Sequence, residues 1–121
     1  MDTIGQKAEN KASEFLQKKG YSILLRNYRF GRFEVDLVCG FKGQIVIVEV
    51  KSLKSLQFKQ PYEAVNMAKQ QRIVRVASHL LKTSFPDQEC RFDIVSIFIQ
   101  KNRCRIEHIC DAFSPQLNAG C

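Results

Sequence analysis

The segment Gln44–Lys51 (QIVIVEVK) is an apolar run that ends in two opposite charges. Most of its apolar side chains are β-branched, which favours a strand that is covered on both faces. Successive side chains of a strand point to opposite faces, so we expect Glu49 and Lys51 to share a face with Ile45 and Ile47. A carboxylate and an ammonium at the end of a buried strand are costly unless something compensates or uses them. The segment therefore predicts an interior strand that carries a functional site.

A second acidic pair lies just upstream, in Phe33–Val38 (FEVDLV). Alternation predicts Glu34 and Asp36 on one face of this strand and Phe33, Val35 and Leu37 on the other. The glycines of Cys39–Gly43 indicate a turn between the two runs, so we expect antiparallel neighbours and Asp36 beside Glu49. Carboxylate oxygens suit hard cations such as Mg²⁺ or Mn²⁺. A neighbouring lysine can hold a phosphate oxygen or orient an attacking water.

The composition indicates one globular domain. The chain has 121 residues, of which 45% are hydrophobic and 26% are charged. We expect the domain to span residues 1–113 and residues 114–121 to form a flexible tail. Neither an apolar run long enough for a membrane span nor an apolar signal core is present, so no membrane partner is expected. The five cysteines are odd in number and form no CxxC pair, which favours a reducing cytoplasm and makes a zinc site or a disulfide framework unexpected.

The net charge of +7 indicates a basic surface around this acidic spot. Such a surface attracts nucleic-acid phosphates, although many small basic proteins bind no nucleic acid. We expect the polar loop of residues 52–60 to present Lys54 and Lys59 to a phosphate backbone. The next helix should run from Pro61 to about Thr83, with Lys69 on its apolar face and Arg72 close by. These two side chains either snorkel from that face or reach the site and its phosphate substrate.

The remaining segments complete the predicted order of elements. A first helix is expected from about Gly5 to Lys19, with Glu9 at the edge of its buried stripe. A salt bridge is the ordinary explanation for such an acid, and a place in the metal site is the functional one. Three more strands are expected in the following segments: Tyr21 to Arg29, Cys90 to Ile99 and Arg103 to Cys110. The single histidines His79 and His108 have no obvious partner in the sequence, which favours structural roles for both.

These motifs, taken in order, resemble the PD-(D/E)xK nuclease superfamily and, within it, the small bacterial YraN-type proteins of the UPF0102 family. The resemblance covers nearly the whole chain. It rests on the following residues: Gly5, Glu9, Ala12, Leu16, Gly20-Tyr21, Leu25-Arg26-Asn27-Tyr28-Arg29, Glu34-Val35-Asp36-Leu37-Val38, Val48-Glu49-Val50-Lys51, Pro61-Tyr62-Glu63-Ala64-Val65, Lys69, Arg72, Arg91-Phe92-Asp93 and Ala112-Phe113.

The resemblance implies a restriction endonuclease-like α/β fold, with a mixed central β-sheet flanked by helices in the order αβββαββ. It also implies metal-binding, catalytic roles for Asp36 and Glu49 and a catalytic role for Lys51. Glu9 corresponds to the helical acid of archaeal Holliday-junction resolvases, and Glu34 would complete the ligand shell directly or through water.

We therefore expect a Mg²⁺- or Mn²⁺-dependent nuclease that acts on DNA, with branched or otherwise structured DNA as a candidate substrate. The phosphate backbone would be held by the four cationic side chains Lys54, Lys59, Lys69 and Arg72. Two alternatives stay open. One is a non-catalytic nucleic-acid-binding or scaffold protein that keeps the nuclease fold, and the other is a protein whose basic face meets an acidic protein partner. A homodimer is compatible with each of them.

Overall fold

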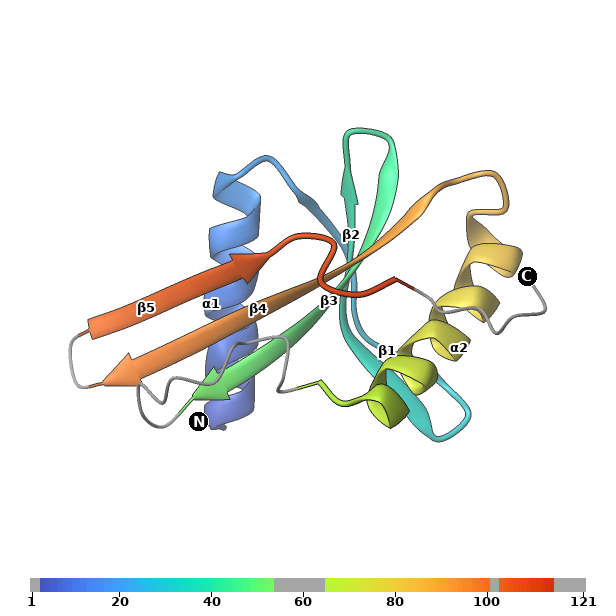
Figure 1. Cartoon of the computed structure of the whole chain (residues 1–121). Helices are drawn as coiled ribbons and strands as arrows, with labels where there is room; N and C mark the ends of the chain where they lie inside the picture. Colours follow the sequence, from blue (N-terminus) through green and yellow to red (C-terminus); the bar gives the residue numbers. More distant parts are fainter. Residues whose placement is uncertain (1–2, 54–64, 101–102, 115–121) are drawn as a thin grey trace.

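The computed structural model describes residues 3–53, 65–100 and 103–114 (Figure 1). Two helices and five strands follow one another in the order αβββαββ. Their bounds are α1 Ile4–Lys18, β1 Ser22–Phe30, β2 Phe33–Phe41, β3 Gln44–Leu53, α2 Met67–Ser84, β4 Cys90–Gln100 and β5 Arg103–Ile109. The strands form one sheet in the order β1-β2-β3-β4-β5, in which β3 and β4 are parallel and the other neighbours are antiparallel.

The β2–β3 hairpin fixes the centre of this sheet. Phe41 pairs with Gln44, which leaves a two-residue loop of Lys42 and Gly43 with φ angles of 47° and 80°. Positive φ at both loop residues is the backbone that matches the twist of a tight hairpin, and glycine adopts it without steric cost. The connection from β3 to β4 contains α2, as parallel neighbours require a crossover.

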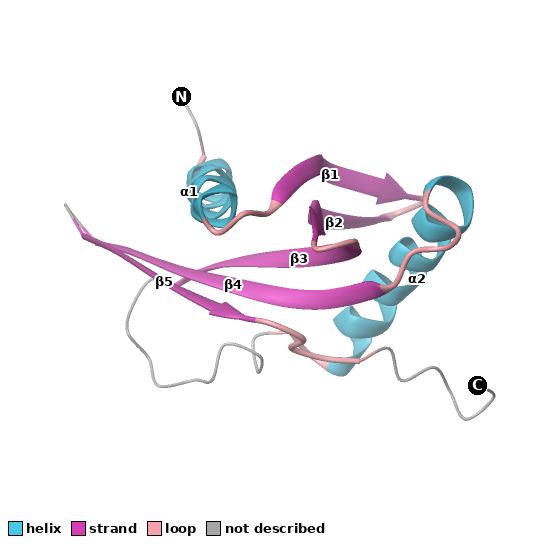
Figure 2. Cartoon of the chain, turned by 90° about the horizontal axis from the view of Figure 1, so that it is seen from above, coloured by secondary structure: helices cyan, strands magenta, loops and turns pink. Residues whose placement is uncertain are grey.

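The two helices cover opposite faces of the sheet (Figure 2). The stripe of Ala8, Ala12 and Leu16 on α1 packs against Val46 and Val48 of β3. On the other face, the α2 stripe of Ile73, Val76, Ala77 and Leu80 packs against Ile45 and Ile47. β3 is therefore buried on both sides, as its near-continuous apolar sequence predicts.

The alternation predicted for β2 breaks at Asp36. Val35 belongs to the core under α2, whereas Leu37 belongs to the core under α1, so these two residues lie on opposite faces. Phe33 and Val35 share the face under α2 as predicted, but the prediction that Leu37 lies on the same face is wrong. The change of phase coincides with the end of the β2–β3 ladder, whose last pair is Leu37 with Val48. Beyond that pair, the backbone of β2 no longer pairs with the backbone of β3.

The start of α2 also differs from the prediction. Val65 and Asn66 are not helical, and the helix begins at Met67 rather than at Pro61. The Asn66 side chain accepts a hydrogen bond from the backbone N–H of Lys69 at 2.9 Å, which is the standard arrangement of a helix N-cap. Val65 is nevertheless buried in the core under α2. Pro61 itself lies outside the described residues.

The predicted α/β architecture is confirmed, because the element order and the mixed sheet between two helices are those expected from the sequence. Phe113 closes the described core by stacking on Phe92 with ring centroids 5.1 Å apart. Apart from Ser114, the predicted tail lies outside the described residues. Neither described helix has the length and apolarity that a bilayer crossing requires.

Candidate functional site

Asp36 and Glu49 meet where β2 and β3 diverge, a separation that is visible in Figure 1. Asp36 Oδ2 accepts a hydrogen bond from the backbone N–H of Val50 at 2.8 Å. The carboxylate thus takes the position that a backbone carbonyl of a continuing β2 ladder would hold. This contact fixes Asp36 beside Glu49, as the hairpin reading of the sequence predicts.

Glu49 is a buried acid, with only 2% of its surface exposed. It follows Ile45 and Ile47 on the face of β3 that α2 covers, which confirms the predicted orientation. Burial raises the pKa of Glu49 to about 10, and a hydrogen bond with the Asp36 side chain and the charge of that carboxylate add to the rise. The charges of Lys69 and Lys51 act in the opposite direction. Without a cation, Glu49 therefore holds a proton at neutral pH.

Two lysines border this carboxyl pair. The pKa of Lys51 is lowered, first by burial and then by a hydrogen bond with Lys69 and the charge of that residue, against the opposing charges of Glu49 and Asp36. Lys69 stands in the first turn of α2, which is fixed by the Asn66 cap. The structure therefore brings Lys69 into the site itself, which favours the second of the two readings left open by the sequence.

The carboxyl pair fits a hard divalent cation. Within the described part of the chain, no hydrogen-bond donor reaches Glu49 Oε1, although this atom is buried. A buried carboxylate oxygen without a partner is costly, and a cation between the two carboxyl groups would both satisfy it and allow both groups to ionise. The all-oxygen donor set is that of Mg²⁺ or Mn²⁺.

Glu9 and Glu34 each have a described partner other than this pair. Glu34 accepts from Arg29 Nε at 2.9 Å. Glu9 Oε1 lies 3.5 Å from Arg26 Nη2, so the salt bridge that the sequence leaves open as its ordinary role is present. Among the described contacts, none joins Glu9 or Glu34 to Asp36 or Glu49. A cation-binding role for either acid stays a prediction.

The other predicted phosphate-binding residues are only partly described. Arg72 lies over the Phe33 ring, 5.7 Å from its centroid, and is exposed on α2. Lys54 and Lys59 lie outside the described residues.

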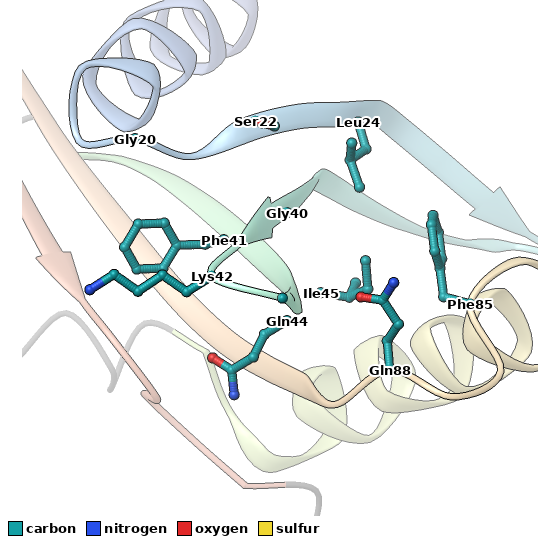
Figure 3. Close-up of a pocket in the computed structure, with 11 residues that line it drawn as sticks. Gly20, Ser22, Leu24, Gly40, Phe41, Lys42, Gln44, Ile45, Phe85 and Gln88 are labelled. Atoms are coloured by element: carbon teal, nitrogen blue, oxygen red, sulfur yellow. The ribbon is translucent and has the colours of Figure 1, made fainter.

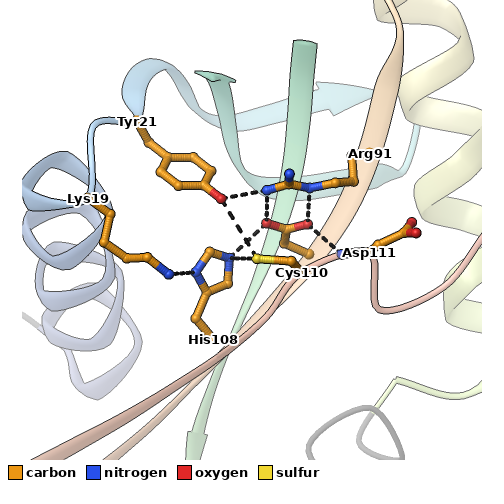
Figure 4. Close-up of polar contacts among 7 residues, drawn as sticks. Lys19, Tyr21, Arg91, His108, Cys110 and Asp111 are labelled. Atoms are coloured by element: carbon orange, nitrogen blue, oxygen red, sulfur yellow. Dashed lines mark hydrogen bonds and ion pairs between the residues drawn. The ribbon is translucent and has the colours of Figure 1, made fainter. Parts of the chain in front are cut away.

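A second polar cluster was not predicted. Asp93 accepts hydrogen bonds from Arg91 and His108 within the core under α1 (Figure 4). His108 therefore has a close partner, which the sequence does not show because Asp93 is 15 positions away on the neighbouring strand. The one available signal was an acid between Phe92 and Ile94, in an otherwise apolar strand.

A cavity of about 440 Å³ lies at the turn end of the β2–β3 hairpin (Figure 3). Residues from the hairpin turn, the start of β1 and the segment after α2 line it, including Phe41, Gln44 and Gln88. Neither Asp36 nor Glu49 lines it, since both lie beyond the opposite end of the hairpin ladder. The carboxyl–lysine site is therefore not part of this cavity.

Fold and site together define a class of small α/β protein. Its mixed sheet carries a buried carboxyl pair and two lysines where two central strands separate. The profile of the family described as "Uncharacterised protein family UPF0102" matches residues 8–97. This chain belongs to the UPF0102 family, as its motifs predict.

Relatives of the same family match almost end to end. A UPF0102 protein of Bacteroides thetaiotaomicron is 41% identical over 114 residues, which cover 94% of both chains. A UPF0102 protein of Natranaerobius thermophilus is 42% identical over 113 residues, covering 90% of this chain and 95% of the relative. Among solved structures, that of Pyrococcus furiosus SfsA in complex with Ca²⁺ is similar with a TM-score of 0.44 and 12% identity, over 84% of this chain and 62% of SfsA.

Proposed function

We propose that this protein is a divalent-metal-dependent nuclease that hydrolyses phosphodiester bonds in DNA. The observation that carries the proposal is the buried Glu49, whose Oε1 lacks a hydrogen-bond donor among the described residues and whose pKa is raised beside Asp36. Two lysines border the pair, as a site for a phosphate and a cation requires. The net charge of +7 supports a nucleic-acid substrate.

Each residue of the site has a definite task in this proposal. Asp36 and Glu49 would hold Mg²⁺ or Mn²⁺, with Asp36 oriented by the Val50 N–H. When bound, the cation supplies Lewis-acid stabilisation of the phosphate charge and lowers the pKa of a bound water. Lys51 would hold a non-bridging phosphate oxygen or orient the attacking water.

The grip on DNA extends along the backbone from the site. Arg72, one helical turn beyond Lys69 on α2, would contact neighbouring phosphates, and so would Lys54 and Lys59, which follow β3 in the sequence. Branched or otherwise structured DNA is the proposed substrate class because, as the resemblance implies, Glu9 would correspond to the helical acid of Holliday-junction resolvases.

A cleavage panel tests the proposal. Linear, nicked, flapped and four-way DNA would be incubated with the protein and either Mg²⁺ or Mn²⁺. We expect cleavage of at least one substrate, a loss of at least about a hundredfold in Lys51→Ala, and DNA affinity within a few-fold of wild type. Lys42→Ala is the matched control, because it removes the same charge from the exposed hairpin turn.

The panel also separates the alternatives. Salt-dependent DNA binding without cleavage by either metal would favour a non-catalytic binding protein. Cleavage that survives equally in Lys51→Ala would mean that the site does not carry the reaction.

A further inference from the structure

Asp93, His108 and Cys110 form a second cluster of potential metal ligands (Figure 4). The cluster lies on the face of the sheet opposite Glu49. One ligand atom from each residue lies within 4.8 Å of the other two. β4 and β5 are antiparallel with Val95 opposite His108, so alternation directs Asp93 and His108 to the face that α1 covers. Cys110 follows β5 in a turn, where its Sγ lies 3.6 Å from His108 Nε2. The side chains of Asp93 and His108 are 0% and 2% exposed, whereas Cys110 is exposed.

Asp93 accepts four hydrogen bonds from the described residues, and a cation could replace the proton of one of them, the proton between His108 and Asp93. Oδ1 accepts from Arg91 Nε at 2.8 Å and from the Asp111 N–H at 3.0 Å. Oδ2 accepts from Arg91 Nη2 at 2.8 Å and lies 2.7 Å from His108 Nε2. The Lys19 ammonium donates to His108 Nδ1 at 2.7 Å, so the imidazole carries its own proton on Nε2, toward Asp93. A cation that replaced this proton would leave the Arg91–Asp93 pair intact.

The distances within the cluster suit a tetrahedral ion with nitrogen and sulfur ligands. Metal–ligand lengths of about 2.0 and 2.3 Å place a histidine nitrogen and a cysteine sulfur about 3.5 Å apart around Zn²⁺. His108 Nε2 and Cys110 Sγ are 3.6 Å apart. Around the same ion, nitrogen and carboxylate oxygen would be about 3.4 Å apart, so the 2.7 Å between His108 and Asp93 has to open by about 0.7 Å.

We propose that Asp93 Oδ2, His108 Nε2 and Cys110 Sγ form a three-ligand site for a Zn²⁺-class cation. On binding, the Cys110 thiol releases its proton to solvent and forms the metal–sulfur bond. His108 moves its proton from Nε2 to Nδ1 and binds through Nε2, while the exposed Lys19 side chain turns away. The fourth position faces solvent on the side of Cys110, as in zinc sites that keep a water or substrate ligand.

This site is independent of the proposed nuclease site. Its donors are nitrogen, sulfur and one oxygen, which select softer metals than the carboxyl pair of Asp36 and Glu49. The positive charge of Arg91 does not exclude a cation, because Arg91 is paired with Asp93. The Cys110 thiolate would add a second negative charge to the site.

Cobalt spectroscopy tests the site directly. The purified full-length protein, kept reduced, would be titrated with Co²⁺. We expect tetrahedral visible bands, a thiolate-to-cobalt charge-transfer band, and loss of both when Zn²⁺ is added. Cys110→Ser should remove the charge-transfer band, and His108→Gln should weaken Co²⁺ binding at least tenfold.

Two controls make the result specific. Cys104→Ser should keep the wild-type spectrum, because Cys104 is a free, exposed cysteine like Cys110 but belongs to β5 and is not part of the cluster. Asp36→Asn should keep it as well, which separates this site from the proposed nuclease centre. Absence of the charge-transfer band at millimolar Co²⁺ would overturn the proposal. So would a band that survives in Cys110→Ser or disappears equally in Cys104→Ser.

Discussion

The buried carboxyl group of Glu49 is costly for folding, and a binding function would explain why this residue is an acid. Placing a carboxyl group at 2% exposure beside Asp36 disfavours its ionised form, yet the surrounding strand is otherwise apolar. An apolar residue at position 49 would pack there without that cost. The carboxyl group is therefore expected to contribute to binding rather than to stability.

In the presence of a chelator, Glu49→Gln should change how the free energy of unfolding depends on pH. The pKa of Glu49 rises from an ordinary 4.5 to about 10 on folding. Between those values the folded protein keeps a proton that the unfolded chain has released, so the free energy of unfolding falls as the pH rises. Glutamine cannot titrate and can still donate to Asp36, so the variant should be more stable than wild type at pH 8, by on the order of 1–3 kcal/mol.

Urea unfolding at pH 5 and pH 8 measures this effect. Glu34→Gln is the matched control, since its carboxylate is paired with Arg29 near the surface. Equal pH dependence in wild type and Glu49→Gln would show that Glu49 is not held in its neutral form.

The second prediction separates Lys69 from Arg72. Lys69 lies beside Lys51 and Glu49, so Lys69→Ala should lower the rate of cleavage about tenfold or more with a smaller effect on DNA affinity. Arg72→Ala should weaken DNA binding and reduce its salt dependence by about one ion, because the exposed Arg72 is placed to contact a backbone phosphate. Single-turnover cleavage and binding at several salt concentrations would distinguish the two. Identical effects of both variants would contradict the assignment.

At the scale of elements, the cap of α2 links helix formation to the site. Asn66→Ala removes the acceptor for the Lys69 N–H and should cost about 1 kcal/mol. It should also lower cleavage, because it loosens the turn that carries Lys69. Thr3→Ala is the control, since Thr3 caps α1 with a similar bond to Gln6 and should lower stability alone. Denaturant unfolding together with cleavage rates measures both effects, and equal loss of cleavage in the two variants would argue against a role for the α2 cap.

The strands could be predicted from sequence because burial on one or both faces leaves a period of two or a continuous apolar run. The pairing of Asp36 with Glu49 followed from the short glycine-bearing turn between their strands. The change of phase at Asp36 could not be predicted, since it depends on where the β2–β3 ladder ends in the folded sheet. The start of α2 was missed because Pro61 and Asn66 are both good first-turn signals, and the described helix uses Asn66.

The site was predictable only where its residues are close in sequence. Glu49 and Lys51 belong to one strand, and Lys69 was found on a helical face without a fixed destination. His108 and Asp93 meet across β4 and β5, and Lys19 approaches from the end of α1. Contacts of this kind depend on strand register and helix position, which a single sequence does not specify.

At the scale of the molecule, the sheet separates two chemically different sites. The carboxyl–lysine site lies under α2, and the Asp93–His108–Cys110 cluster lies under α1. The chain as a whole carries a net charge of +7, which suits association with a polyanion. The proposed function nevertheless depends on a local property: Asp36 and Glu49 together would bind a hard divalent cation.

Calorimetric titration with Mn²⁺ at pH 7.5, in two buffers of different ionisation enthalpy, tests this claim most directly. Glu49 holds a proton in the metal-free protein and must lose it to bind a cation. The account predicts Mn²⁺ binding with release of about one proton per ion, and loss of that binding in both Asp36→Asn and Glu49→Gln. Absence of binding at millimolar Mn²⁺, or binding that neither substitution changes, would contradict it.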